Sequence, residues 1–308
     1  MCGFAVPVFF MASGYVLMNK SNITWNYTKH KIGVILRMVV AWNILRWFIS
    51  LSGILLGKDI SEYSILYLIK QILGSLIQKG KMWQFWYFGA LIIIYLLLPL
   101  LHRIYTKKII FRCCTISWAY VLWAFLLMTA VVIQACSMVC EEALQQNVIQ
   151  TFRLWSWLQY FILGGLLVEL SLIISDKISA KIHFTLLCVS SMGIVLYQYI
   201  VGRDILDTMY AEYFYDIILM FVWIVILFTW VLRLKFSETQ EYCISTLCGL
   251  TVGVYIIHPT VISVMTKIIP VNSFGMVVVN FLVVAVISFI IIYAMSKIKI
   301  IKKYLLSM

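Results

Sequence analysis

The stretch WQFWYFGALIIIYLLLPLL, residues 83–101, decides the fold class of this chain. It carries no charged residue, and a helix needs about 20 mainly apolar residues to cross the hydrocarbon core of a bilayer. Eight further apolar runs of similar length occur at residues 1–18, 32–56, 113–138, 155–174, 183–201, 213–232, 243–266 and 273–296. The sequence therefore predicts an all-α, polytopic integral membrane protein of about nine transmembrane helices. We expect a single transmembrane domain over residues 1–308 and no soluble domain, because the loops are too short to hold one.

The composition favours lipid as the solvent of this chain. Hydrophobic residues make up 64% of it and charged residues 12%, whereas a soluble domain carries roughly 25% charged residues. So few charges cannot cover a surface that faces water. Membrane lipid is therefore the first expected partner.

The basic residues indicate how the chain is oriented. They give a net charge of +12 and lie mostly in short loops between apolar runs, which favours contacts with anionic lipid headgroups over nucleic-acid binding. If residue 1 lies outside, fifteen of the 24 Lys and Arg residues fall in inside segments and seven in outside segments. Because inside loops carry the excess of Lys and Arg, the chain is predicted to have its N-terminus outside and its C-terminus inside.

Familiar motifs for metals, nucleotides and hydrolytic catalysis are absent from the sequence. The four histidines are scattered, and most of the eight cysteines lie within apolar runs without a C-x-x-C pair. We find no P-loop, G-x-S-x-G, H-E-x-x-H or Rossmann glycine pattern. No metal site and no bound cofactor are therefore expected. Cys136 and Cys140 are one helical turn apart, which leaves a disulfide or a metal as an alternative.

The segment 58–82 is the longest outside connection and has a helical pattern of its own. Between Tyr63 and Ile77, apolar residues recur at helical spacing. We expect an amphipathic helix that lies on the outer face of the membrane or dips into the bundle.

The second apolar run has a polar face. It is formed by Asn43, Arg46, Ser50 and Gly53, whose spacing places them on one side of a helix. Such groups are costly in lipid and usually face the interior of a bundle. Arg46 is either satisfied by helix carbonyl groups or lines a polar cavity that binds an anionic group. Asp216, the acidic residue within the seventh run, is a candidate member of this cavity and a candidate partner of Arg46.

Two further motifs have both a structural and a functional interpretation. His258 precedes Pro259, which removes one helical hydrogen bond and frees the carbonyl group of Tyr255. A kink beside a titratable side chain suits a catalytic site, whereas a lone histidine in a membrane also serves as a hydrogen-bond donor between helices. Ser13 and Gly14 are small residues that let helices approach closely.

Four motifs are distributed over almost the whole chain: VPVFFMASGY at residues 6–15, WYF to YLLLP at 86–99, YFILG at 160–164 and YIIHP at 255–259. In the same order, they resemble motifs of the acyltransferase family 3 membrane proteins, which include O-acetyltransferases of lipopolysaccharide, peptidoglycan and other surface glycans. The first motif is the most specific and is similar to the family pattern V-P-x-F-F-x-x-S-G-[YF]. The candidate site residues at family-motif positions are Phe9, Phe10, Ser13, Gly14, Trp86, Tyr87, Tyr255 and His258.

The resemblance implies a fold of about ten membrane helices and acyl transfer at the bacterial plasma membrane. The donor would be an acyl-CoA used from the cytoplasmic side, with acetyl-CoA as the expected substrate. The acceptor would be a hydroxyl group of a glycan or lipid-linked sugar at the outer side. Arg37, near the inner end of its helix, is placed to contact the phosphate groups of coenzyme A.

Several positions depart from the family pattern. The first family helix carries an Arg and a His regarded as the catalytic base, and this chain begins at what would be the second family helix. Gln84 stands where the family often has His, and Arg37 alone remains of an R-x-x-R motif because Val34 occupies its first position. Attack of an alcohol on a thioester needs a general base. We therefore expect a chain that lacks the first family helix, with His258 as a replacement base only if it faces the same cavity.

Two other functions remain open from the sequence. A transporter or flippase of envelope precursors would also use the polar face around Arg46, although no internal repeat is visible. A non-catalytic membrane protein or gene remnant would fit the missing base. The membrane part of a resistance-type serine racemase is a related alternative within the family, but residues 297–308 hold no racemase domain.

Overall fold

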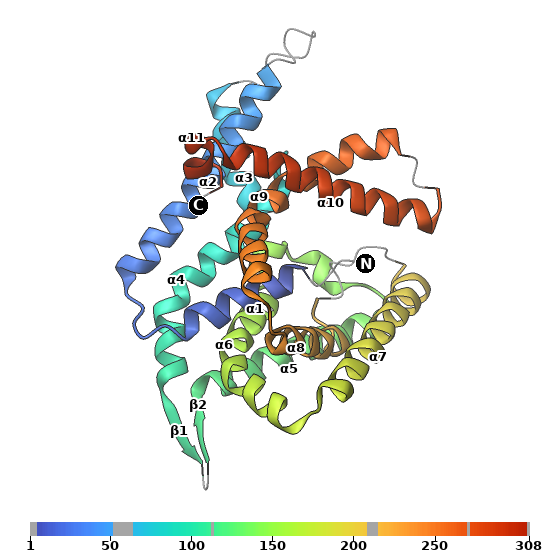
Figure 1. Cartoon of the computed structure of the whole chain (residues 1–308). Coiled ribbons are helices and arrows are strands. Elements are labelled where there is room, and N and C mark those ends of the chain that lie inside the picture. Colours follow the sequence, from blue (N-terminus) through green and yellow to red (C-terminus); the bar gives the residue numbers. More distant parts are fainter. Residues whose placement is uncertain (1–4, 52–63, 112–113, 208–214, 270–271, 307–308) are drawn as a thin grey trace. The chain divides into compact units, whose positions relative to one another are not determined.

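The computed structural model describes residues 5–51, 64–111, 114–207, 215–269 and 272–306, and this part of the chain is almost entirely helical (Figure 1). Each of the nine predicted runs overlaps one helix: α1 (Ala5–Met18), α2 (Trp25–Leu51), α4 (Trp86–Thr106), α5 (Trp118–Val139), α6 (Leu154–Lys177), α7 (Ala180–Tyr199), α8 (Ile218–Arg233), α9 (Glu238–Ile268) and α10 (Phe274–Ser296). The prediction of an all-α polytopic membrane protein is confirmed.

The predicted count of about nine spans stays a prediction for two of the nine helices. Within the described residues, seven helices are long and apolar enough to cross a membrane. The helices α1 and α8 have 14 and 16 residues, which is short of the roughly 20 residues that a span requires.

The fourth predicted run begins differently from the expectation. Strand β1 (Lys108–Phe111) pairs in antiparallel register with β2 (Cys114–Ser117), so the helix predicted from residue 113 starts only at Trp118. The prediction of helix over 114–117 was wrong, because this segment is rich in β-branched residue types, which favour strands. Ser117 then starts α5 by accepting a hydrogen bond from the backbone N–H of Ala119 at 3.1 Å.

The amphipathic helix predicted in the outer connection is present as α3 (Ile65–Leu76). Its N-cap is Ser64, whose hydroxyl oxygen accepts a hydrogen bond from the N–H of Tyr67 at 3.1 Å. The apolar side chains of Ile65, Leu66, Ile69 and Leu73 are exposed on one face. Such a face suits contact with lipid at the membrane surface.

Internal contacts divide the chain into two compact units that interleave along the sequence. Unit 1 comprises residues 1–30 and 86–234, and unit 2 comprises residues 31–85 and 235–308. Unit 1 contains α1, α4 to α8 and the hairpin, together with the short helical turns η4 (Leu144–Asn147), η5 (Gln150–Phe152) and η6 (Ile200–Ile205). Unit 2 contains most of α2, with α3, η3 (Trp83–Phe85), α9, α10 and α11 (Lys299–Tyr304).

Each unit is built around one closely packed pair of helices. In unit 1, α1 lies along α6, as the blue and yellow-green ribbons show (Figure 1). In unit 2, α9 packs against α10, and the indole Nε1 of Trp42 on α2 donates a buried hydrogen bond of 2.7 Å to the carbonyl oxygen of Leu305. These pairs hold three of the four motifs, and α4 holds the fourth.

Candidate functional site

The first two family-like motifs meet in the aromatic core of unit 1. The ring of Phe10 is fully buried, with its centroid 4.9 Å from that of Tyr87 and 5.1 Å from that of Trp157. The Phe9 ring lies 6.0 Å from Tyr87, and the hydroxyl group of Ser13 is hydrogen bonded to Tyr87. These positions therefore join α1, α4 and α6 into one packed cluster.

Two glycines of the motifs allow the backbones of α1 and α6 to touch. A Cβ atom added to Gly14 would collide with the carbonyl oxygen of Phe161, and one added to Gly164 would collide with that of Met11. No side-chain movement relieves a clash with backbone. The geometry therefore supports the packing interpretation of the Ser13-Gly14 pair.

Asp216 lies in a turn ahead of α8, outside the seven candidate spans, so its predicted place within a helix was wrong. Its carboxylate accepts hydrogen bonds from the indole Nε1 of Trp155 at 3.2 Å and from the hydroxyl group of Ser156. Burial raises the pKa of the carboxyl group, and these two donors together with the positive charge of Arg153 oppose that rise. The carboxylate is thus held by partners of its own unit.

Arg153 takes part in this cluster although the sequence analysis treated it as a loop cation. It is only 4% exposed, and its Nε donates to the carbonyl oxygen of Val148 at 2.9 Å. A signal was present, because Arg153 lies two residues before the Trp155-Ser156 pair at the start of an apolar run. The predicted pairing of Arg46 with Asp216 stays a prediction, because these residues belong to different units.

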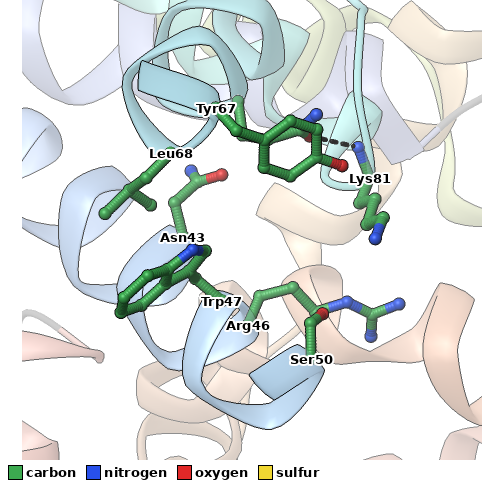
Figure 2. A pocket seen from close by; sticks show the side chains of 8 residues that line it. Asn43, Arg46, Trp47, Ser50, Tyr67, Leu68 and Lys81 are labelled. Carbon is green, nitrogen blue, oxygen red and sulfur yellow. Dashed lines mark hydrogen bonds between the residues drawn. The ribbon is translucent and has the colours of Figure 1, made fainter. Parts of the chain in front are cut away.

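The polar face of α2 borders a small pocket of unit 2 (Figure 2). The pocket, of about 20 Å³, is lined by Asn43, Arg46, Trp47, Ser50, Tyr67, Leu68, Gln71 and Lys81. The structure therefore brings together three of the four polar-face residues, while Gly53 lies outside the described residues. A pocket of this size holds no more than a water-sized group.

Two cations give this pocket its charge. Figure 2 shows the guanidinium group of Arg46 and the amine of Lys81 directed to the same side of the pocket. The side-chain amine of Lys81 lies 5.7 Å from the centroid of the Tyr67 ring. The backbone N–H of Lys81 donates to Oε1 of Gln71 at 2.9 Å. No carboxylate occurs among the lining residues. The pocket is therefore suited to one oxygen atom of an anionic group.

Asn43 has a structural partner on the neighbouring helix. Its Nδ2 donates to the carbonyl oxygen of Val39 at 2.9 Å and to the hydroxyl oxygen of Ser75 at 3.3 Å. The side chain is 4% exposed. Asn43 therefore links α2 to α3 and fixes one wall of the pocket.

A larger apolar pocket of about 250 Å³ shares Arg46 with the small one. It lies among α2, α9 and α10 and is lined by Trp42, Leu45, Arg46, Ile49, Met82, Ile256, Ile257, Thr260, Val261, Ile291 and Met295. An apolar pocket bordered by a single cation suits an alkyl or acyl chain that ends in an anionic group.

His258 does not line either pocket that contains Arg46. Its Nδ1 lies 2.7 Å from the carbonyl oxygen of Tyr255, to which Pro259 has no backbone N–H to donate. A carbonyl oxygen can only accept, so Nδ1 carries a proton, and in the neutral ring Nε2 then keeps its lone pair. His258 thus satisfies its own helix, and its role as a catalytic base stays a prediction.

The histidine-proline motif is also tied to η3 of the same unit. The hydroxyl group of Tyr255 donates to the carbonyl oxygen of Gln84 at 2.6 Å, and Nε2 of Gln84 donates to the carbonyl oxygen of Ile256 at 3.0 Å. Gln84 is 4% exposed. The position at which the sequence departs from the family pattern therefore holds η3 against α9, a role that the sequence analysis did not identify.

Arg37 lies exposed on α2, and its guanidinium carbon is 5.8 Å from the centroid of the Tyr304 ring on α11. Cys136 and Cys140 are both free and exposed. In the described part of the chain, no group of three or more His, Cys, Asp or Glu residues is arranged to hold a metal ion.

Comparison with known proteins agrees with the motif analysis. A family model described as an acyltransferase domain, acyltransferase 3, matches residues 1–297. A curated amino-acid racemase of Enterococcus faecalis is 26% identical over an alignment that covers 96% of this chain and 40% of the racemase. The chain thus spans less than half the length of that relative. No solved structure matches the chain.

Proposed function

Because the chain belongs to the acyltransferase 3 family, we propose that it moves an acyl group from a cytoplasmic acyl-CoA to a hydroxyl group of a cell-envelope glycan or lipid-linked sugar. The observation that carries the proposal is the extent of the family match, residues 1–297 of 308. Apolar helices and the family together make the chain a multi-pass membrane acyltransferase in general. The activity of the racemase relative is not part of the proposal, since the chain covers only 40% of that protein.

The proposed direction of transfer follows from the charge distribution. Fifteen basic residues fall in the segments assigned to the inside and seven in those assigned to the outside, which favours a C-terminus in the cytoplasm of a bacterial plasma membrane. The donor, proposed to be acetyl-CoA, then approaches the end of the bundle that carries Arg37. The acceptor approaches the opposite end, where α3 and Lys81 lie.

The chemistry requires one proton to move. The acceptor oxygen bonds to the acyl carbon, the carbon–sulfur bond breaks, and coenzyme A leaves as a thiolate. A base takes the hydroxyl proton during the attack, because an alcohol is too weakly acidic to ionise near neutral pH. In this chain we propose Nε2 of His258 as that base, since the hydrogen bond of Nδ1 to Tyr255 leaves the Nε2 lone pair available.

The apolar pocket beside Arg46 supports a lipid-linked acceptor. It offers about 250 Å³ among α2, α9 and α10, and the guanidinium group at its border offers donors to a phosphate. An isoprenoid or acyl chain would occupy the apolar part, with its phosphate at the border.

Inside-out membrane vesicles that contain the chain test the proposal directly. Vesicles are supplied with acetyl-CoA labelled in the acetyl group, and label is followed in alkali-labile esters of the lipid-linked and glycan fractions, with free thiol measured in parallel. We expect ester label and thiol release that depend on the chain, with vesicles lacking it as the control. Movement of an envelope precursor across the membrane without ester label would contradict the proposal and favour a transporter.

A further inference from the structure

A second charged pocket of unit 2 lies where α9, α10 and α11 meet, away from the residues considered so far. It has a volume of about 460 Å³ and is lined by Ser245, Thr246, Gly249, Leu250, Tyr293, Ser296, Lys297, Lys299 and Lys302. Its lining therefore contains three lysines and no carboxylate. The acidic residues of α9, Glu238 and Glu241, lie in the first turn of that helix, ahead of the lining residues.

Buried contacts hold the lysine-bearing segment in place. The carbonyl oxygen of Leu305 accepts the 2.7 Å hydrogen bond from Trp42. The Leu306 side chain packs against Gly253 so closely that an added Cβ atom would lie 2.7 Å from its Cδ2. Leu305 and Leu306 are 9% and 3% exposed. These anchors follow α11 directly, so its lysines project from a fixed support.

The lysine ammonium groups are the hydrogen-bond donors available in this pocket. Lys299 and Lys302 are three residues apart on α11 and share a face of the helix. The hydroxyl groups of Ser245 and Thr246 already donate to the carbonyl oxygen of Tyr242, at 3.0 and 2.9 Å. An anion in the pocket would therefore be bound by lysine ammonium groups.

We propose that this pocket binds a ligand with several phosphate groups, namely the 3′-phosphate and diphosphate of the acyl-CoA donor. The assignment rests on the proposed function for the identity of the donor. A volume of about 460 Å³ lies within the usual range for small-molecule sites, and lysines bind phosphates as point charges. Arg37, beside Tyr304 at the end of α11, adds a further cation near the same segment.

The position of the pocket agrees with this ligand. It shares α9 and α10 with the apolar pocket, and Leu250 of one pocket and Ile256 of the other are six residues apart on α9. A helix rises about 9 Å over six residues. The phosphate end of the donor would thus bind one turn or two from the apolar pocket, at the end of the bundle that the basic residues assign to the cytoplasm.

Anionic lipid headgroups carry the same phosphate chemistry, so the test separates the two sources. The full chain is placed in nanodiscs of phosphatidylcholine, and binding of coenzyme A and of 3′-dephospho-coenzyme A is measured by calorimetry without turnover. The test variant is Lys299→Gln with Lys302→Gln. Each single variant, Lys299→Gln or Lys302→Gln, is compared with the control Lys303→Gln, which removes one lysine charge from the same segment at a position outside the pocket.

We expect the double variant to weaken coenzyme A binding at least about tenfold and to lose the preference over the dephospho form, while the control changes binding less than about twofold. Equal weakening in the single variants and the control, or no weakening in the double variant, overturns the assignment. In nanodiscs of phosphatidylglycerol, lipid retention that depends on Lys299 and Lys302 without any effect on coenzyme A also overturns it, in favour of a lipid site. Because binding needs no turnover, loss of acyl transfer with intact coenzyme A binding contradicts the proposed function and leaves the pocket assignment standing.

Discussion

The Nδ1 atom of His258 lies 2.7 Å from the carbonyl oxygen of Tyr255, the acceptor that loses its helical partner because Pro259 has no N–H. The side chain therefore replaces a backbone hydrogen bond within its own helix. This arrangement separates two roles of the histidine, support of α9 through Nδ1 and proton transfer through Nε2.

A pair of substitutions distinguishes these roles. His258→Ala should lower the free energy of unfolding by about 1 kcal/mol, because the hydrogen bond between Nδ1 and the carbonyl oxygen of Tyr255 is lost. Adding Pro259→Ala restores the backbone N–H and should recover that stability, measured by thermal unfolding of the purified protein. Acyl transfer that stays lost although stability returns would assign the base to Nε2. Acyl transfer that returns with stability would rule it out.

Gly14 provides a test of the contact between α1 and α6. Gly14→Ala should destabilise the protein by roughly 1–3 kcal/mol or more, because the new Cβ atom meets the backbone of Phe161. The control is Gly33→Ala on α2, where no atom lies within 4 Å of an added Cβ and the change should stabilise the helix slightly. Equal melting temperatures for the two variants would contradict the described packing.

Loss of the negative charge of Asp216 should destabilise the folded protein. Asp216→Asn places an amide where Trp155 and Ser156 both donate, so we expect a loss of about 1–3 kcal/mol in the free energy of unfolding. Asp176→Asn is the matched control, since Asp176 is exposed near the end of α6. A normal melting temperature for Asp216→Asn would show that the cluster does not depend on the carboxylate.

The pairing of Arg46 with Asp216 is tested by exchange of the two charges. If the residues interact, Arg46→Asp and Asp216→Arg should each abolish acyl transfer, and the double variant should recover part of it. A double variant as inactive as the single ones, at equal expression in the membrane, speaks against the pair.

Arg37 is expected to act on the donor. Arg37→Ala should raise the KM for acetyl-CoA about tenfold with a smaller change in kcat, because a charge-assisted contact to a phosphate is lost. Lys29→Ala, which removes an exposed cation from the first turns of the same helix, serves as the control. An unchanged KM for acetyl-CoA in the Arg37→Ala variant would contradict this role.

The features that were predictable from the sequence are those set by local pattern. Apolar runs located nine helices and helical spacing of apolar residues located α3, whereas α11 lies in a segment that was read only as a basic tail. The same reasoning placed Asn43, Arg46 and Ser50 on one face, and they do line one pocket. The hairpin at Lys108–Ser117 was missed because an apolar segment with β-branched residues is read as helix when hydropathy alone is considered.

Features that depend on distant contacts were not predictable. Arg153 lies in a loop by its sequence, yet it is buried beside Asp216, which is 63 positions later in the chain. Lys81 lines the same pocket as Arg46 because α3 packs against α2. Likewise, Lys299 and Lys302 looked like an ordinary basic tail, and their pocket exists because Trp42 and Gly253 anchor the residues that follow them.

The contact between Gly14 and Phe161, repeated by Gly164 against Met11, also limits how unit 1 can move. The main chains of these two helices touch at two points. The helices therefore cannot slide past each other or separate without losing both contacts. α1 and α6 should therefore travel as one rigid body during any cycle of substrate entry and release. Any hinge that such a cycle requires has to lie outside this pair of helices.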